Sequence, residues 1–149
     1  MKILIACSSG GHLTQALALK DWWGRHDRCW ATFPVADARS RLADERVYEI
    51  HYPTVRNVRN LLRNFVLARQ VLSQERPDVI FSTGAAIALP FFSQARIYGA
   101  RTVYLEPVDR IVAPGLSGRL VYPFTDAFLV QWEQMLRHYP EARDVGIVL

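Results

Sequence analysis

The segment Ile3-Leu4-Ile5-Ala6-Cys7-Ser8-Ser9-Gly10-Gly11-His12 carries the strongest fold signal of this sequence. The apolar run 3–7 predicts a strand that is buried on both faces, because it does not alternate with polar residues. Small residues follow at 8–11, and apolar residues then recur at helical spacing from Leu13 onward. A buried strand, a glycine turn and a helix in this order are typical of the first unit of a doubly wound α/β sheet.

The same alternation continues along the chain. Short apolar runs predict strands at 3–7, 29–33, 47–50, 79–82, 102–105 and 127–130, with a last edge strand at 146–149. Helical patterns predict helices at 13–23, 36–43, 55–74 and 87–98, and Pro90 is tolerated only in the first turn of its helix. No repeat or linker interrupts the pattern. The sequence therefore predicts one α/β domain over residues 1–149, with a doubly wound, mostly parallel Rossmann-like sheet.

Composition and charge restrict the class of protein. The chain has 149 residues, of which 50% are hydrophobic and 21% charged, as expected of a globular domain. The formal net charge of +4 favours an anionic partner, although a mildly basic surface without function explains it equally well. Without a basic run or an aromatic platform, nucleic acid is not expected as a partner.

Cysteine use and hydropathy predict where the protein acts. Cys7 and Cys29 lie in strand-like runs without metal-ligand spacing, so we expect two small buried side chains and a reducing cytoplasm. No apolar run approaches the roughly 20 residues that span a bilayer. We therefore expect a cytoplasmic protein whose membrane contact is peripheral.

Ligands of doubly wound sheets bind at the carboxyl ends of the strands, which directs attention to loops 8–12, 52–54, 83–86 and 106–115. In the first loop, Ser9, Gly10 and Gly11 lead into a helix, where the backbone N–H groups suit an anion. Neither a Walker loop nor the G-x-G-x-x-G fingerprint fits this spacing. The loop thus predicts phosphate binding without a standard nucleotide motif.

Individual side chains in these loops have a functional and a structural interpretation. His12 is a candidate general base, or a helix-start histidine bonded to backbone. Thr83 and Gly84 are candidate ligand contacts, or a tight strand-to-helix turn. Glu106 and Arg110 suit sugar hydroxyls and pyrophosphate respectively, or they form a local salt bridge.

The helix expected at 55–74 combines an apolar arc with a basic edge. The apolar arc includes Val55, Val58 and Leu62, and the basic edge holds Arg56, Arg59 and Arg63. This pattern is typical of a helix at an anionic membrane surface. It also fits a helix whose apolar arc packs on the sheet and whose arginines are solvated. Both hold if the sheet covers the centre of the arc and lipid covers its rim or its N-terminal turns.

Taken together and in order, five segments resemble a known family. They are Ser9–His12, Asp78–Gly84, Tyr104–Glu106 with Arg110, Leu116–Pro123 and Asp126–Trp132. The chain resembles the fourteenth asparagine-linked-glycosylation (Alg) protein family and its bacterial exopolysaccharide and capsule counterparts. It is also similar to the N-terminal domain of the transferase that makes the peptidoglycan lipid precursor. Eukaryotic Alg members carry an N-terminal anchor, whereas residues 2–7 here begin with a strand, which favours the bacterial branch.

The resemblance implies the acceptor half of a GT-B glycosyltransferase. A partner resembling the thirteenth Alg protein would hold the UDP-sugar, and this subunit would bind a lipid-linked saccharide at an anionic membrane on the inner face of the cell. The transfer would be an inverting hexosyl or N-acetylhexosaminyl transfer in polysaccharide biosynthesis, with no activity without the partner. His12 would be the base, Glu106 would bind a sugar hydroxyl, and Gly10, Gly11 and Arg110 would neutralise the pyrophosphate. No metal or cofactor is implied. The relatives have Glu-Ser where this chain has Glu106-Pro107.

The alternative to a transferase subunit is a stand-alone nucleotide or small-molecule-binding Rossmann module.

Overall fold

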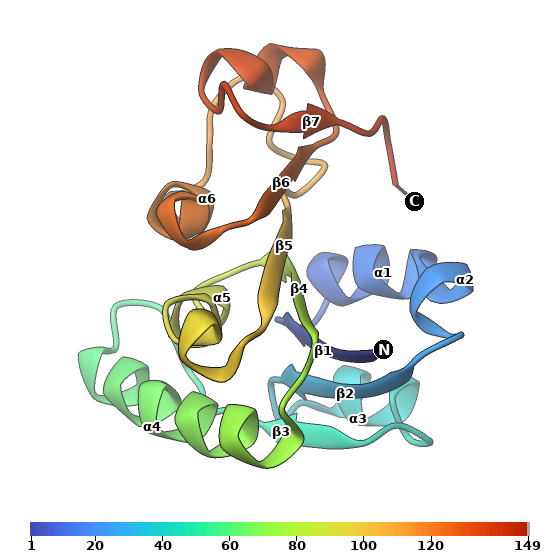
Figure 1. The fold of residues 1–149 in the computed structure, drawn as a ribbon, viewed down its shortest axis with the longest axis vertical. Coiled ribbons are helices and arrows are strands. Elements are labelled where there is room, and N and C mark those ends of the chain that lie inside the picture. The colour runs from blue at the N-terminus through green and yellow to red at the C-terminus, as the bar shows by residue number, and fades with distance from the viewer. Residues whose placement is uncertain (149) are drawn as a thin grey trace.

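The computed structural model describes residues 1–148 and contains one parallel sheet (Figure 1). The strand order is β3-β2-β1-β4-β5-β6-β7, and every neighbouring pair is parallel. The strands are β1 (Lys2–Cys7), β2 (Asp27–Thr32), β3 (Val47–Glu49), β4 (Val79–Gly84), β5 (Arg101–Leu105), β6 (Ala127–Val130) and β7 (Arg143–Asp144). The predicted doubly wound Rossmann-like sheet is confirmed.

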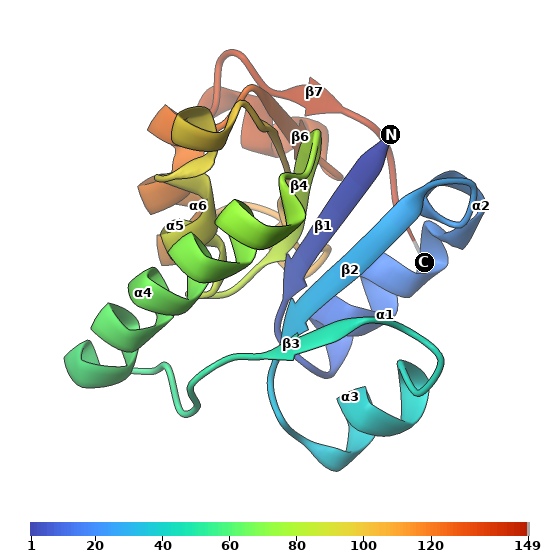
Figure 2. The same ribbon diagram turned by 60° about the horizontal axis from the view of Figure 1, so that its bottom comes forward.

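Helices cover both faces of the sheet (Figures 1 and 2). One face carries α1 (Gly11–Ala18), α2 (Lys20–Trp23) and α3 (Ala36–Arg41). The other face carries α4 (Val58–Glu75), α5 (Ala88–Phe92) and α6 (Leu116–Val121). Three short 3-10 helices complete the described part of the chain, namely η1 (Ala95–Tyr98), η2 (Tyr122–Phe124) and η3 (Glu133–Arg137).

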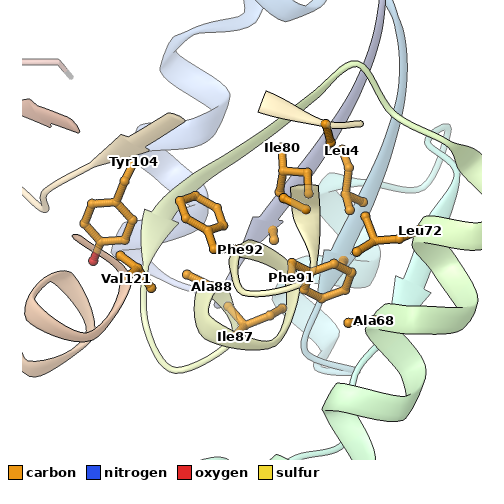
Figure 3. Packing of buried hydrophobic residues seen from close by; sticks show 14 of the residues in the cluster. Leu4, Ala68, Leu72, Ile80, Ile87, Ala88, Phe91, Phe92, Tyr104 and Val121 are labelled. Atoms are coloured by element: carbon orange, nitrogen blue, oxygen red, sulfur yellow. The ribbon is translucent and has the colours of Figure 1, made fainter. Parts of the chain in front are cut away.

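The two faces of the sheet form two separate cores because side chains alternate along each strand. In β1, Leu4 and Ala6 pack under α4 and α5, whereas Ile3, Ile5 and Cys7 pack under α1. Figure 3 shows the first of these cores, in which side chains from β1, β4, α4 and α5 meet.

Both cysteines are buried, as predicted, and burial raises the pKa of Cys7 and of Cys29 to about 12. The two thiols are therefore protonated at neutral pH.

Several predicted boundaries are wrong. The helix expected at 13–23 is broken at Leu19, which lies outside the helical region of φ and ψ. The helix expected at 87–98 ends at Phe92, although Pro90 does lie in its first turn. The last edge strand is not at 146–148: Gly146 has φ +71°, and its N–H donates to Asp144 Oδ1 at 2.9 Å, which ends β7 in a turn. Leu149, also part of that predicted strand, lies outside the described residues.

Helix α4 is buried along a face different from the one expected. Its buried residues are Asn60, Asn64, Ala68, Val71, Leu72 and Glu75. Asn64 accepts from the His51 N–H at 2.8 Å and donates to the His51 carbonyl at 3.1 Å, and Asn60 donates to the Pro53 carbonyl at 2.9 Å. These bonds hold the backbone of the loop that precedes the helix. The helix is thereby turned so that much of its apolar arc faces outward.

Candidate functional site

The order of the strands reverses between β1 and β4, which lie side by side at the centre of the sheet. In doubly wound sheets, ligands bind beyond the carboxyl ends of the strands at this switch point. The β1–β4 pairing is irregular here, since its register shifts between Ile5 and Cys7 and Cys7 pairs with Gly84. The loops that follow β1 and β4 therefore form the centre of the candidate site.

The loop after β1 presents an uncapped helix end. Gly10 has φ +68°, which glycine adopts without strain, and α1 begins at the next residue. The first helical bond runs from the Thr14 N–H to the Gly10 carbonyl at 2.9 Å, and the N-cap residue Gly10 supplies no side-chain cap. The Gly10 N–H donates to Asp37 Oδ2 at 3.4 Å. Gly10 and Gly11 are exposed and Ser9 is half-buried. The predicted anion-binding loop is therefore open to solvent at the positive end of α1.

His12 is fixed by the end of β4. Its Nδ1 lies 2.7 Å from the Thr83 carbonyl oxygen, and Thr83 Oγ1 donates to the His12 carbonyl at 2.8 Å. A carbonyl can only accept, so Nδ1 carries the proton, and in the neutral imidazole Nε2 is the unprotonated nitrogen. Both loops of the switch point are thereby joined through one histidine.

Thr83 and Gly84 lie behind His12 and do not face solvent. Thr83 is fully buried, and Gly84 is buried with φ +120°. A Cβ at Gly84 would lie 2.9 Å from His12 Cε1 and 3.1 Å from the Tyr104 hydroxyl, so the ring packs directly on the glycine backbone. The structure places these two predicted ligand contacts where they support His12.

Glu106 is a buried carboxylate at the start of α6. Its Oε1 accepts from the Gly115 N–H at 2.9 Å, while Oε2 is buried and has no hydrogen-bond partner among residues 1–148. Burial raises the pKa of the Glu106 carboxyl above its ordinary value, and the Gly115 N–H and Arg110 oppose that shift. Glu106 is only 1% exposed, and its contact with a sugar hydroxyl stays a prediction.

A small cavity brings the predicted residues together. It has a volume of about 210 Å³, and His12, Glu106 and Arg110 line it with Tyr104 and Ser117. The Arg110 side chain is 47% exposed, and its Nε lies 3.7 Å from Asp109 Oδ2, a long ion pair that leaves the guanidinium accessible. Three of the predicted site residues thus share one cavity at the carboxyl edge of the sheet.

A larger and more apolar cavity adjoins the first one. Its volume is about 390 Å³, and it lies between the N-terminal end of α4, the start of α5 and α6. Leu116 and Ser117 line both cavities, which makes the cavities neighbours. Arg56 lines the larger cavity.

The outer side of α4 forms an apolar surface with a basic edge. Val58, Leu62 and Val66 of the helix are exposed, from 60% at Val66 to 70% at Val58. Val55, 79% exposed, and Arg56 lie in the loop before the helix, which begins at Val58 and not at residue 55 as predicted. The exposed Arg56, Arg59 and Arg63 form no ion pair within the described part of the chain. Exposed apolar side chains in contiguous patches mark interaction sites. The expectation that the sheet covers the centre of the apolar arc is wrong, because burial lies to one side of that arc.

Within residues 1–148, no group of three His, Cys, Asp or Glu side chains is placed to hold a metal ion. None of the helices in the same range combines the length and the apolar composition needed to cross a bilayer.

Comparison with known proteins identifies the family. A family model described as "Oligosaccharide biosynthesis protein Alg14 like" matches residues 35–148. The chain belongs to this Alg14-like family. The predicted resemblance is confirmed. The model begins after the Gly10–His12 loop, so the position of that loop rests on the structure.

Relatives of this Alg14-like chain fall into two groups. The UDP-N-acetylglucosamine transferase subunit ALG14 of Yarrowia lipolytica is 33% identical over 95 residues, covering 58% of this chain and 43% of that protein. The UDP-N-acetylglucosamine--N-acetylmuramyl-(pentapeptide) pyrophosphoryl-undecaprenol N-acetylglucosamine transferase of Rippkaea orientalis is 28% identical over 159 residues, covering 98% of this chain and 44% of that protein. Among solved structures, MurG of Acinetobacter baumannii aligns with a TM-score of 0.75 at 19% identity, covering 90% of this chain and 43% of that one. The Alg14-like chain spans less than half the length of each of these proteins.

Sequence reasoning missed the contribution of α6. Leu116 and Leu120 are exposed apolar residues one helical turn apart, and both line the larger cavity. Their i, i+4 spacing is a helical signal, but six residues are too few for periodicity to identify a helix. Gly118 is required because a Cβ there would overlap Glu106 Oε2.

Proposed function

We propose that this chain is the acceptor-binding, membrane-associating subunit of an inverting glycosyltransferase. A separate nucleotide-sugar-binding subunit holds the UDP-sugar, and the acceptor is a polyprenyl-pyrophosphate-linked saccharide. The observation that carries the proposal is the fixed His12, which shares a cavity with Arg110 at the switch point of the sheet. The names of the relatives support the reaction class, since one is a UDP-N-acetylglucosamine transferase subunit and another acts on a pyrophosphoryl-undecaprenol.

His12 is the proposed general base. Because Nδ1 donates to the Thr83 carbonyl, Nε2 of the neutral ring is free to accept a proton. The acceptor hydroxyl oxygen forms a bond to the anomeric carbon while the bond from that carbon to the UDP oxygen breaks. The hydroxyl proton passes to Nε2. Attack from the side opposite the leaving UDP inverts the anomeric centre.

The acceptor pyrophosphate is assigned to the first loop and to Arg110. The exposed Gly10–Gly11 segment lies at the positive end of α1, with Ser9 beside it. Its Gly10 N–H donates to Asp37 Oδ2 at 3.4 Å, so the pyrophosphate would take the place of that carboxylate. Arg110 supplies a charge-assisted donor from the other side of the cavity. Glu106 is assigned a positioning role, since it holds the Gly115 N–H at the start of α6.

Membrane association is assigned to the outer side of α4. A polyprenyl chain remains in the bilayer, so its pyrophosphate lies at the level of the headgroups. The exposed Val58 and Leu62 suit insertion at that level, and Arg59 and Arg63 suit attraction to anionic lipid. This assignment predicts a protein that acts at the inner face of the cell membrane.

Equilibrium binding tests this division of labour. We expect the chain alone to bind a prenyl-pyrophosphate saccharide and to bind UDP-sugars at least tenfold more weakly, because the nucleotide site lies on the partner. Isothermal titration calorimetry with both ligands measures the ratio. Tight binding of a UDP-sugar or a dinucleotide to the chain alone would support the stand-alone nucleotide-binding alternative and would contradict the proposal.

A further inference from the structure

The larger cavity has the position and the lining of a binding site for an apolar chain. Apolar side chains from three helical elements surround it, among them Leu61 of α4, Leu89 of α5 and Leu120 of α6. Its volume of about 390 Å³ lies within the range of small-molecule pockets, which is about 300–1,000 Å³. A cavity of this size and lining favours a hydrocarbon ligand over water.

The cavity is directly connected to the polar part of the site. Leu116 and Ser117 form a shared wall with the cavity that holds His12 and Arg110. On the α4 side, Arg56 also lines the larger cavity, so cationic groups occur in the lining of both. A ligand with an anionic group beside Arg110 and an apolar chain against the leucines of the larger cavity suits the two cavities together.

We propose that this cavity binds the isoprenyl units next to the pyrophosphate of the acceptor, so that the start of the lipid chain leaves the bilayer and lies between α4, α5 and α6. The inference rests on the proposed function, which supplies the pyrophosphate. Taking about 30 Å³ for each carbon, close to the volume of a water molecule in the liquid, the cavity holds roughly 13 carbons, which is two complete five-carbon units and part of a third. The rest of the chain would continue past the exposed Leu116 and Val58 into the membrane.

This site differs from the membrane-facing surface of α4. Val58 and Arg56 belong to both sites. Leu62 and Val66 belong to that surface alone, whereas Ala86 and Leu89 line the cavity and are only partly exposed. Substitutions at Leu62 or at Ala86 therefore change one site without the other. If the lipid chain binds in the cavity, affinity should depend on the length of the isoprenyl chain even when no membrane is present. Adsorption to the outer surface of α4 predicts no such dependence.

The test measures binding of inorganic pyrophosphate and of dimethylallyl, geranyl and farnesyl pyrophosphate to the full chain in detergent-free buffer. Each buried methylene adds substantially to affinity, so we expect geranyl pyrophosphate to bind at least tenfold more tightly than dimethylallyl pyrophosphate. Farnesyl pyrophosphate should add less than threefold further, because its third unit extends beyond the cavity. Equal affinities across the series would overturn the proposal.

Variants identify the location. Ala86→Phe fills the cavity and should remove the gain in affinity of geranyl over dimethylallyl pyrophosphate, while inorganic pyrophosphate binds as before. Leu120→Phe fills the cavity from α6 and replaces the first variant if that variant does not fold. Ile97→Gln, which changes an exposed apolar residue of η1 outside the cavity, should leave the gain intact. Retention of the gain in both filled variants would overturn the proposal.

Three further results separate this inference from the proposed function and from another occupant. If the partner subunit displaces bound geranyl pyrophosphate, the cavity is part of the subunit interface and the inference is wrong. If the chain-length series is flat but the two subunits together still transfer sugar to a polyprenyl acceptor, the inference fails and the proposed function stands. If geranyl pyrophosphate binds as expected but no sugar is transferred, the cavity is supported and the transferase assignment fails.

Discussion

His12 and Thr83 hydrogen-bond to each other twice, through the imidazole Nδ1 and the Thr83 carbonyl at 2.7 Å and through the Thr83 hydroxyl and the His12 carbonyl at 2.8 Å. These bonds join the first turn of α1 to the end of β4, where the order of the strands reverses. They also select the tautomer with a free Nε2. The proposed chemistry depends on this one arrangement.

Replacing His12 by alanine should lower kcat of the two-subunit enzyme by roughly 10²–10⁴, the usual contribution of a general base. Steady-state kinetics with saturating acceptor measures the loss. The thermal unfolding midpoint and partner binding should change little, because the Thr83 hydroxyl still has the backbone carbonyl of residue 12 to bond. Full turnover in the variant would show that His12 is only structural.

Gly84→Ala should lower both stability and kcat. The added Cβ would lie 2.9 Å from His12 Cε1 at a φ of +120°, so the ring must move. Gly99→Ala is the control for a positive φ without a contact, since Gly99 is in the left-handed region with φ +74° and no atom lies within 4 Å of the new Cβ. Its backbone strain is smaller than that at Gly84, where φ is +120°. We expect the control to lose about 1 kcal/mol of unfolding free energy and to keep its full activity. Equal kcat losses in the two variants would show that contact with His12 is irrelevant.

Glu106→Gln should change how stability depends on pH. Burial raises the pKa of the folded-state carboxyl above the ordinary value of 4.5. Between the unfolded and folded pKa values the folded chain binds more protons, so this group makes the unfolding free energy fall as pH rises. The stability of the variant relative to the native chain should therefore increase as pH rises above 4.5. Denaturant titrations from about pH 4.5 to about pH 7.5 measure that difference. If the difference in unfolding free energy between the variant and the native chain stayed constant over this range, burial would not raise the pKa of Glu106 in the folded chain.

Changing Arg56, Arg59 and Arg63 together to glutamine should weaken binding to vesicles that contain an anionic phospholipid. Each arginine near such a surface contributes about 1 kcal/mol, so three account for roughly a hundredfold. Co-sedimentation at increasing salt concentration measures the effect, which should fade as screening increases.

The control for this prediction carries the same change in net charge elsewhere. Arg25, Arg137 and Arg143 are exposed and lie outside α4, so their triple glutamine variant should keep its vesicle binding. An equal loss in the two triple variants would mean that net charge, and not the α4 edge, attracts the protein to lipid.

The strands β1 to β6 and their order of appearance were predictable because uninterrupted apolar runs are typical of strands buried on both faces. The strand β7 has no such run, since it consists of the exposed Arg143 and Asp144. The position of His12 followed from the strand-to-helix turn at Ser9–Gly11. The orientation of α4 was not predictable from periodicity, because Asn60 and Asn64 are buried to bond the loop at His51 and Pro53. A polar residue that bonds a neighbouring loop has the same sequence pattern as one that faces water.

The role of α6 was also beyond the sequence. Its N-cap residue is held by a contact from the Gly115 N–H to Glu106, nine residues earlier, which apolar periodicity does not reveal. The burial of Glu106 is likewise not indicated by its residue type. Tertiary placement decided both features.

Reconstitution of sugar transfer tests the central claim most directly. The chain, its nucleotide-sugar-binding partner and the two together are each given a UDP-sugar, with UDP-N-acetylglucosamine first, and a polyprenyl-pyrophosphate saccharide in vesicles. Only the mixture should form the elongated lipid-linked product, with the new linkage inverted relative to the donor. Product formation by the chain alone, or a mixture that binds both substrates and transfers nothing, would contradict the account.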